Sequence, residues 1–339
     1  MRFFKYFSIA VVILAAILFW QSRQGEYQQL RGYIFGTYYS IKVRSDKPVK
    51  DFARMVDGRF NLVNRQMSVF VTDSTVNQIN NADKNQWLDI PEELFFVLQG
   101  ADKVYKQSNG AFDPTVGKLV NLWGFGPDGR RNTPDKDEIK AVMKHLGFSK
   151  IKLQPPHRVS KTDAAARVDL SAIAKGYAVD LIAKTLKASG YDDFLVDIGG
   201  EVYASGNRSK TDSGWNIGIA EPAETGRKNL MSVGLRDMAV ATSGNYHNFY
   251  YQDGKKISHT IDPLTGWPAE HNLVSATVFS PSCMVADAYA TALMSMGEKK
   301  GLIFADKYNL AAILFVKDSQ GRIETLYSKQ AQILLGIKS

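Results

Sequence analysis

The chain has one cysteine, Cys283, among its 339 residues. A single thiol excludes an internal disulfide and a cysteine-based metal cluster. It is compatible with an oxidising compartment, because no second thiol is available for mispairing within the chain. The sequence also lacks an internal repeat and a low-complexity segment, which excludes a solenoid and argues against a disordered tract.

Positive charge is only moderately in excess, since 42 Lys and Arg against 34 Asp and Glu give a net charge of +8. There is no arginine-rich run and no nucleic-acid-binding signature, so nucleic acid is not the expected partner. The surplus suits an anionic membrane face or a phosphorylated ligand, and we favour the ligand. A hydrophobic content of 45% allows a sizeable core, in one large domain or two closely packed ones.

The first residues have the pattern of an export signal. Arg2 and Lys5 precede an apolar run from Phe7 to Trp20, and Arg23 follows it. From Phe3 to Trp20 the stretch is about long enough to span a bilayer, and no A-x-A cleavage site follows the run. We therefore predict an uncleaved N-terminal membrane anchor; a cleaved signal peptide and a buried helix of the domain are the alternatives. Positive charge before the span favours a short N-terminus inside and an exported body.

This interpretation divides the chain into three parts. Residues 1–23 are the signal anchor or signal peptide, and the polar residues 24–31 are a linker. Residues 32–339 are the functional domain.

The pattern of apolar residues predicts an α+β fold. Helical spacing or helix start signals occur at Pro48–Met67, from Pro91 towards Asn109, after Thr133-Pro134, at Ser171–Ala188 and at Ser282–Gly297. Strands are predicted at Gly36–Val43, Phe194–Ile198, Trp215–Ala220, Met231–Val240 and Leu273–Phe279, with a hairpin turn at Asp253-Gly254. Helices and strands come in mixed blocks without regular βαβ alternation, which favours mixed or antiparallel sheets with flanking helices.

Two oxygen-bearing residues lie at the rim of the apolar face of the Ser282–Gly297 helix. Asp287 and Thr291 are four residues apart, so their oxygens can converge on one point. A carboxylate and a hydroxyl make half of a site for a hard cation such as Mg²⁺, which completes its shell with water and substrate phosphate. The alternative is an ordinary polar edge of a helix.

Three glycine- or hydroxyl-rich junctions follow apolar strands. The segment 168–177 places Asp169 and Ser171 at a helix start among small residues, which favours either a bound anion or a simple helix cap. Asp197 to Glu201 suits either a tight turn or a close approach of the backbone to a ligand. Thr242 to Tyr246 carries two hydroxyls that suit phosphate oxygens, or equally a turn. Gly199-Gly200 lacks the G-x-G-x-x-G spacing of a Rossmann dinucleotide site.

Further candidate residues are a histidine and two stretches rich in glycine and aromatic residues. His259 is a potential general base, because its ordinary pKa lies near neutrality, although a histidine beside a turn is more often structural. The stretches 110–117 and 122–127 combine glycines with aromatic residues, which suits a stacked heteroaromatic ligand or ordinary core packing.

The order of these motifs resembles that of the ApbE family, the FAD:protein FMN transferases. The resemblance runs from about Gly32 to about Tyr308. The motifs that carry it are Gly36-Thr37, Met67-Ser68, Gly110 to Val116, Asp169 to Gly176, Asp197 to Gly200, Thr242 to Asn245, Ser258 to Pro263, Thr265-Gly266 and Ala286-Asp287. The resemblance implies a magnesium-dependent enzyme that cleaves the pyrophosphate of FAD. It would leave FMN in phosphodiester linkage to a threonine or serine of a partner protein and release AMP.

The resemblance also implies roles for individual residues. Metal ligands would be Asp287, Thr291 and the backbone carbonyl of Ala172, and His259 would be the candidate base. Contacts to the flavin nucleotide would be made by Phe35, Ser68, Val69, Phe70, Ala111, Phe112, Asp113, Asp169, Lys175 and Ile261.

Three residues depart from the family pattern. Phe35 stands where methionine is usual, Lys175 stands where some members have an acid, and Ala290 replaces an aspartate that ligates metal in some relatives. The last departure implies a sparser metal shell.

Two other functions remain open. The same site could use water instead of a protein hydroxyl, as an FAD pyrophosphatase yielding FMN and AMP. A flavin-binding protein without turnover is the third possibility. Asp287 and Thr291 argue against it, because binding FAD needs no metal. The family suggests a subunit of an Rnf- or Nqr-type membrane redox complex as flavin acceptor. The expected location is a bacterial inner membrane, with the catalytic domain facing the periplasm.

Overall fold

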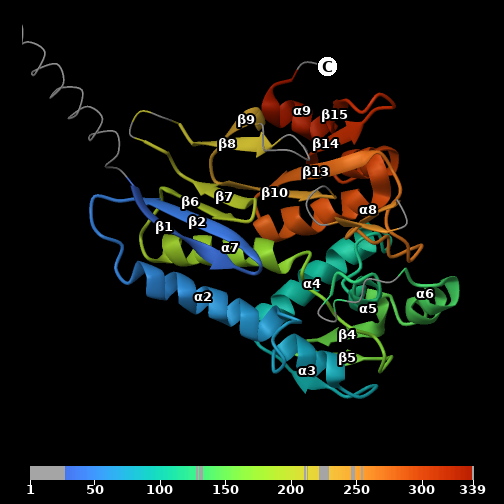
Figure 1. Cartoon of the computed structure of the whole chain (residues 1–339). Coiled ribbons are helices and arrows are strands. Elements are labelled where there is room, and N and C mark those ends of the chain that lie inside the picture. The colour runs from blue at the N-terminus through green and yellow to red at the C-terminus, as the bar shows by residue number, and fades with distance from the viewer. Residues whose placement is uncertain are drawn as a thin grey trace, which may run out of the picture.

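The computed structural model describes residues 27–126, 129, 133–209, 211, 213–220, 229–245, 249–252 and 255–337. An eight-stranded sheet forms the centre of the molecule, with the strand order β1-β2-β6-β7-β10-β13-β14-β15, and each ladder in it is antiparallel (Figure 1). The strands are β1 (Tyr27–Ile34), β2 (Thr37–Arg44), β6 (Phe194–Ile198), β7 (Glu201–Ser205), β10 (Met238–Gly244), β13 (Leu273–Ser280), β14 (Ala311–Lys317) and β15 (Ile323–Tyr327).

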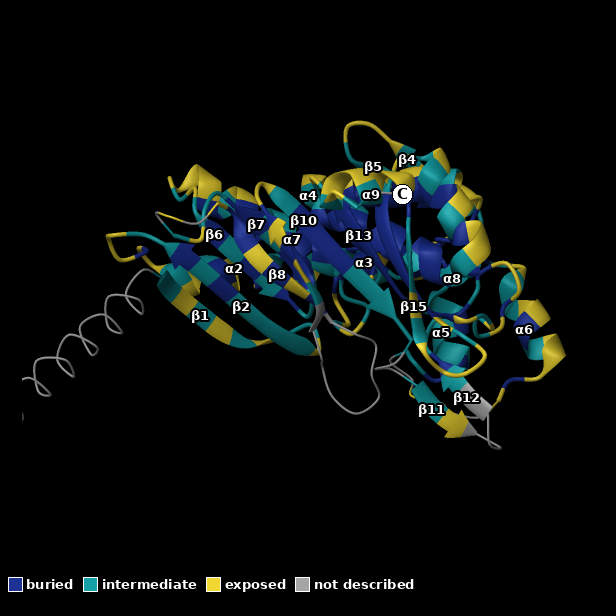
Figure 2. Ribbon diagram, turned by 90° about the horizontal axis from the view of Figure 1, so that it is seen from above, coloured by how far each residue is buried: buried dark blue, intermediate teal, exposed yellow. Residues whose placement is uncertain are grey.

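Long helices cover one face of this sheet and enclose the larger core. In Figure 1, α2, α7 and α8 lie beneath the sheet, and α4 packs against α8. Figure 2 shows that the central strands β7, β10 and β13 are largely buried, whereas the outer helices expose one side. The bounds of these helices are α2 (Phe52–Met67), α4 (Glu92–Gln107), α7 (Ala174–Ala188) and α8 (Cys283–Lys307). Their apolar faces supply the buried side chains that hold helices and sheet together.

The opposite face of the sheet carries a smaller core under a hairpin and a short helix. The hairpin consists of β8 (Trp215–Ala220) and β9 (Asn229–Leu235), and the helix is α9 (Lys329–Leu335). Trp215, Ile217 and Phe315 are among the buried residues there.

The remaining elements form a side region that closes one end of the molecule. They are α3 (Thr75–Asn81), β3 (Leu88–Asp89), α5 (Gly117–Leu122), α6 (Lys136–Met143), η1 (Phe148–Lys150), β4 (Ile151–Gln154), β5 (Arg158–Lys161), β11 (Phe249–Gln252) and β12 (Lys255–Ser258). A third cluster around Trp123, Ile139 and Ile261 joins α5 and α6 to the chain after β12. The Trp123 indole donates to the carbonyl of Gly266 at 2.9 Å, which ties the two segments together.

The α+β class with antiparallel sheets and flanking helices is confirmed, but three boundaries were wrong. The strand expected at Met231–Val240 is two strands, because the chain turns at Asp237, whose φ is 50°. The helix expected from Ser171 begins at Ala174. The helix expected to end at Gly297 continues to Lys307, with a kink at Gly297 where φ is 75°.

The N-terminal boundary also differs from the prediction. Residues 27–31, assigned to the linker 24–31, belong to β1, which is the edge strand of the large sheet. Their polar character fits an edge, because one side of such a strand faces solvent. Over the part of the chain that the structure describes, no helix has the length and apolar character needed to cross a membrane. The predicted anchor 1–23 and the turn Asp253-Gly254 lie outside the described residues.

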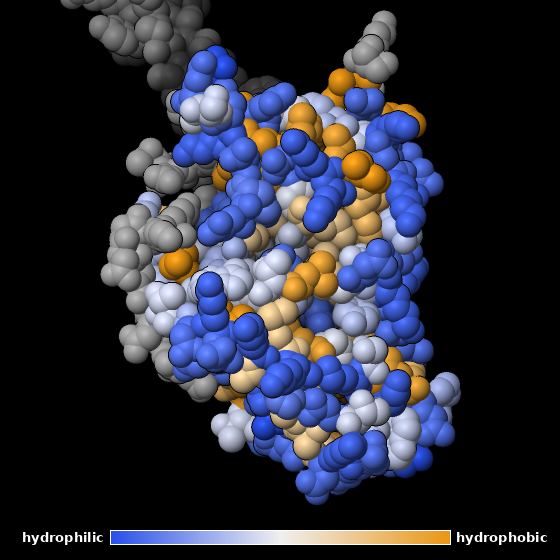
Figure 3. Space-filling view, turned by 90° about the vertical axis from the view of Figure 1, so that its right-hand side faces the viewer, coloured by the Kyte–Doolittle hydropathy of each residue, from blue (hydrophilic) through white to orange (hydrophobic). Residues whose placement is uncertain are grey.

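The face to the right in Figure 1 is mainly hydrophilic. Figure 3 shows small groups of hydrophobic residues between the hydrophilic ones on that face. Isolated exposed apolar side chains are normal on a protein surface.

Candidate functional site

A cavity of about 1240 Å³ opens between the large sheet, the helices beneath it and the side region. It is large enough for a dinucleotide, since ligand pockets commonly measure about 300–1,000 Å³. The fourteen residues that the family resemblance implied all line it: Phe35, Ser68, Val69, Phe70, Ala111, Phe112, Asp113, Asp169, Ala172, Lys175, His259, Ile261, Asp287 and Thr291. The fold thus brings together side chains that are spread over more than 250 positions of sequence.

Helix α8 is fixed against α7 by a carboxylate that caps its N-terminus. Asp180 of α7 accepts hydrogen bonds from the Ser282 hydroxyl at 2.7 Å, the Cys283 N–H at 2.8 Å and the Met284 N–H at 3.0 Å. A carboxylate at a helix N-terminus satisfies N–H groups that lack partners within the helix. The two helices also approach closely at Gly176, where a Cβ atom would lie 2.7 Å from the carbonyl carbon of Cys283. Their relative position is therefore set by backbone contact and by this cap.

This packing places Asp287 against the first turn of α7. Asp287 is 3% exposed, and its Oδ2 accepts a hydrogen bond from the Gly176 N–H at 3.0 Å. In a regular helix this N–H would donate to the carbonyl of Ala172, four residues earlier. Its use by Asp287 leaves the Ala172 carbonyl without that donor, beside the same carboxylate.

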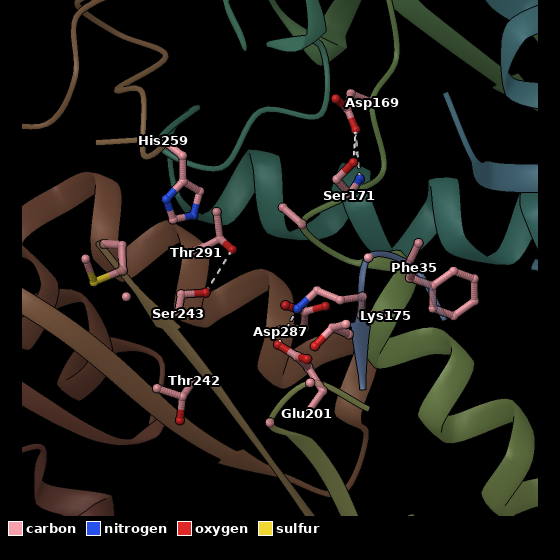
Figure 4. Close-up of a pocket in the computed structure, with 18 of the residues that line it drawn as sticks. Phe35, Asp169, Ser171, Lys175, Glu201, Thr242, Ser243, His259, Asp287 and Thr291 are labelled. Atoms are coloured by element: carbon pink, nitrogen blue, oxygen red, sulfur yellow. Dashed lines mark hydrogen bonds and ion pairs between the residues drawn. The ribbon is translucent and has the colours of Figure 1, made fainter. Parts of the chain in front are cut away.

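Thr291 lies one turn further along α8 and faces the cavity. Its hydroxyl lies 3.2 Å from the Ser243 hydroxyl of β10. Asp287, Thr291 and Ala172 thus all lie at the cavity and offer oxygen atoms to it, as Figure 4 shows for the first two.

A second buried carboxylate lies close to Asp287. Glu201, the first residue of β7, is 2% exposed, and its Oε1 pairs with the Lys175 ammonium at 2.6 Å. The other carboxylate oxygen of Glu201, Oε2, is buried and has no hydrogen-bond partner among the described residues. Figure 4 shows the side chains of Lys175, Glu201 and Asp287 pointing toward one another.

The pKa values of this cluster follow from burial and from mutual charge. Burial raises the pKa of Glu201 to about 7, against the opposing effect of the Lys175 ammonium, and Asp287 adds to the rise. Burial also raises the pKa of Asp287, although Lys175 and the Gly176 N–H oppose this. Burial alone would lower the pKa of Lys175, but Glu201 and Asp287 outweigh it and raise that pKa.

The oxygen atoms of this cluster and of Thr291 and Ala172 fit a hard cation that keeps part of its hydration shell. Two buried carboxylates face one ammonium, so the fully ionised cluster carries one excess negative charge. Carboxylate, hydroxyl and carbonyl oxygens are the donors that Mg²⁺ prefers, with water or phosphate at the remaining positions. Within the described ranges, no group of three or more His, Cys, Asp and Glu side chains is gathered to hold a metal by itself. The residues therefore fit Mg²⁺ bound together with a phosphate ligand.

Aromatic side chains also line the cavity. Phe35 (φ 53°) and Gly36 (φ 73°) form the turn between β1 and β2, and the Phe35 ring packs edge-on against Phe60 with centroids 5.6 Å apart. Ser68 follows the end of α2, and its hydroxyl accepts the Phe70 N–H at 3.2 Å. The Phe70 side chain is 68% exposed at the cavity wall, which leaves its ring free to stack on a flat ligand.

The two aspartates expected at the ligand also hold local turns. Asp113 Oδ1 accepts the N–H of Thr115 at 2.8 Å and its hydroxyl at 2.6 Å. Asp169 Oδ1 likewise accepts the Ser171 N–H at 2.9 Å and its hydroxyl at 2.5 Å. This Asp169 turn precedes α7, which begins at Ala174. Each aspartate therefore shapes the backbone of the cavity wall, in addition to any ligand contact.

His259 lies directly after β12 and faces the cavity. Its ring stands edge-on to Phe125 with centroids 6.2 Å apart. Ile261, two residues later, is 6% exposed and belongs to the core cluster of α5 and α6. The histidine is thus carried on a segment that the side region anchors.

The sequence assigned no role to Glu201 or Asp180, and it gave the Ser243 hydroxyl only a general suitability for phosphate oxygens. Glu201 directly follows Gly199-Gly200 in the sequence. These two glycines form a turn with φ values of 66° and 104°, and both line the cavity. That signal suggested a close backbone approach but no role for the acid. Asp180 and Ser243 become significant only through contacts between distant elements.

Comparisons with known proteins show the family of the chain. The model of the ApbE family matches residues 35–314. An FAD:protein FMN transferase of Vibrio cholerae serotype O1 is 35% identical over 318 residues, which cover 92% of this chain and 94% of the relative. One of Haemophilus influenzae is 34% identical over 323 residues, with coverage of 92% and 93%.

Solved structures show the same architecture. The apo crystal structure of Pseudomonas stutzeri flavinyl transferase ApbE matches with a TM-score of 0.84 and 34% identity, covering 93% of this chain and 98% of that one. The flavin transferase ApbE from Vibrio cholerae matches with a TM-score of 0.83 and 34% identity, with coverage of 91% and 99%. On these matches, in sequence and in fold, the chain belongs to the ApbE family.

Proposed function

We propose that this chain is an FAD:protein FMN transferase that depends on Mg²⁺ and releases AMP. The acceptor is a threonine or serine hydroxyl of another protein. Its oxygen forms a bond to the phosphorus on the FMN side of FAD, and the bond from that phosphorus to the bridging oxygen breaks. AMP leaves with the bridging oxygen, and the hydroxyl proton passes to a base of the enzyme.

The observation that carries this proposal is the incompletely neutralised acid cluster at the wall of a dinucleotide-sized cavity. A pyrophosphate resists attack until its negative charge is neutralised, and bound Mg²⁺ supplies that neutralisation. Asp287, Thr291 and the Ala172 carbonyl would hold the ion. Ala290, where some relatives have an acidic ligand, is fully buried and offers no oxygen from its side chain, so this chain relies on the smaller set.

The other residues of the cavity bind and orient the reactants. Phe35 and Phe70 offer aromatic faces for the isoalloxazine or adenine ring. Lys175 adds positive charge beside the diphosphate. His259 accepts the proton of the attacking hydroxyl, a role that contributes about 10²–10⁴-fold to rate in enzymes generally.

The proposal extends to where the enzyme works. We place it in the periplasm, held to the inner membrane by residues 1–23, with a subunit of an Rnf- or Nqr-type redox complex as acceptor. Support comes from the charged and apolar pattern of the N-terminus. Cell fractionation with protease added to spheroplasts tests this: a membrane-bound, protease-accessible domain is expected, and a protected domain contradicts it.

One incubation tests the chemistry. Purified enzyme, FAD, MgCl₂ and an acceptor domain are mixed, the acceptor is denatured, and its flavin fluorescence and the released AMP are measured. We expect fluorescence that stays with the acceptor and an equal amount of AMP. FMN and AMP free in solution would indicate a pyrophosphatase instead, and FAD left intact would indicate a binding protein.

A further inference from the structure

Glu201 is a buried acid whose contacts connect it to the proposed cation site through Lys175. The Lys175 ammonium donates to Glu201 Oε1 at 2.6 Å. Among the ion pairs of the described residues, Glu201 is the carboxylate within contact of that ammonium, whereas Asp287 acts on it at longer range. The ammonium is thus held near Asp287 without forming an ion pair with it.

This arrangement matters because Lys175 and a divalent cation compete for the same carboxylate. Asp287 is buried, and among the described residues its hydrogen bond comes from the Gly176 N–H. A lysine ammonium on a flexible stem moves to whatever anion is available in a low-dielectric site. If Glu201 lost its charge, Asp287 would be the remaining anion in reach of that ammonium.

We infer that Glu201 is a positioning residue that pairs with Lys175 and so leaves the negative charge of Asp287 to the divalent cation. The inference rests on the proposed function and adds to it a residue that sets metal affinity. The ion pair of Glu201 and Lys175 has no net charge, so the cation meets one uncompensated carboxylate.

Charge arithmetic gives an order of affinities that four proteins can test. Glu201→Gln removes one negative charge and leaves the ammonium unpaired, so the net charge of the cluster becomes one unit more positive. We expect this to weaken cation binding by at least about tenfold. Lys175→Met removes the competitor and tightens binding. The double variant restores the original net charge, so its affinity returns to within about threefold of the parent.

The measurement is Mn²⁺ binding followed by electron paramagnetic resonance, without nucleotide. The expected order of affinity is Lys175→Met above the parent, the parent close to the double variant, and Glu201→Gln weakest. Asp237→Asn, which breaks a surface ion pair with Lys187 at 3.4 Å, is the matched control and should leave Mn²⁺ affinity unchanged.

Each outcome has a definite meaning. A double variant as weak as Glu201→Gln would overturn the inference, because it would make Glu201 a direct ligand or a purely structural residue. Equal affinity of Glu201→Gln and the parent would also overturn it. A parent that takes up no Mn²⁺ would refute the cation site itself, and with it the magnesium dependence of the proposed function.

A second readout separates positioning from folding. At saturating Mg²⁺, Glu201→Gln should recover most of the parental rate of FMN transfer, while the Mg²⁺ concentration for half-maximal rate rises by the same factor as the Mn²⁺ dissociation constant. A rate that stays low at all Mg²⁺ concentrations would contradict a role in cation affinity.

Discussion

Replacing Gly176 by alanine tests the idea that close packing of α7 on α8 builds the site. The added Cβ would lie 2.7 Å from the carbonyl carbon of Cys283 and 2.8 Å from the Cα of Met284, and closer still to the Cys283 oxygen. All three atoms are backbone, so no side chain can rotate away and the helices must separate. Overpacking of this kind costs about 1–3 kcal/mol, and the backbone contact puts Gly176→Ala near the upper value.

Helix propensity opposes this cost. Alanine is about 1 kcal/mol better than glycine inside a helix, so the net destabilisation expected for Gly176→Ala is about 2 kcal/mol. Gly58→Ala is the matched control, because Gly58 lies on the exposed side of α2 and its Cβ would meet no atom within 4 Å. That variant should gain about 0.5–1 kcal/mol.

The assay pairs urea unfolding with the rate of FAD cleavage. The Gly176 N–H donates to Asp287, so separating the helices moves the proposed metal ligand. A displacement of about 1 Å at a catalytic group can cost about 100-fold in rate, and we expect a loss of that order for Gly176→Ala. Stability and rate equal to those of Gly58→Ala would refute the close-packing argument.

Three further predictions concern single side chains. Asp180→Asn weakens the charge-assisted cap on α8 and should lower the free energy of unfolding by about 1–3 kcal/mol, measured in urea; an unchanged value would show that the cap is dispensable. In metal-free protein, burial raises the pKa of Glu201 from its ordinary value of 4.5 to about 7. Between these two pH values the folded state therefore holds a proton that the unfolded state has lost. The free energy of unfolding should therefore fall as pH rises through that interval, and it should fall less in Glu201→Gln. If urea unfolding gave the two proteins the same pH dependence, this prediction would be contradicted. His259→Ala should bind FAD with parental affinity by flavin fluorescence but lose about 10²–10⁴-fold in transfer, and transfer at the parental rate would remove His259 from the mechanism.

Local sequence patterns predicted the helices and strands that bury a clear set of apolar residues. The apolar arc of the helix after Ser282 placed Asp287 and Thr291 on one rim, and the structure puts both in the cavity. The strand at Phe194–Ile198 was predicted at its observed bounds, because a buried strand gives a clear run of apolar residues. The polar edge strand β1 gave no such signal and was assigned to a linker.

Contacts between distant segments were beyond local patterns. Lys175 and Glu201 are 26 positions apart and meet only because β7 runs beside α7. Asp180 and the start of α8 are separated by about 100 positions, so nothing near either one signals the cap. The break at Asp237 required a non-glycine residue with positive φ, which the apolar pattern of its neighbours concealed.

The most direct test of the account is the rate of FAD cleavage by Asp287→Asn, measured with Mg²⁺ and again with EDTA. Asparagine keeps the shape of the side chain but removes the charge that the cation requires. We expect a loss of at least about 10³-fold with Mg²⁺, equivalent to about 4 kcal/mol of transition-state stabilisation, and a parental enzyme that falls equally low in EDTA. Cleavage by Asp287→Asn at the parental rate with EDTA present would contradict the metal-centred site.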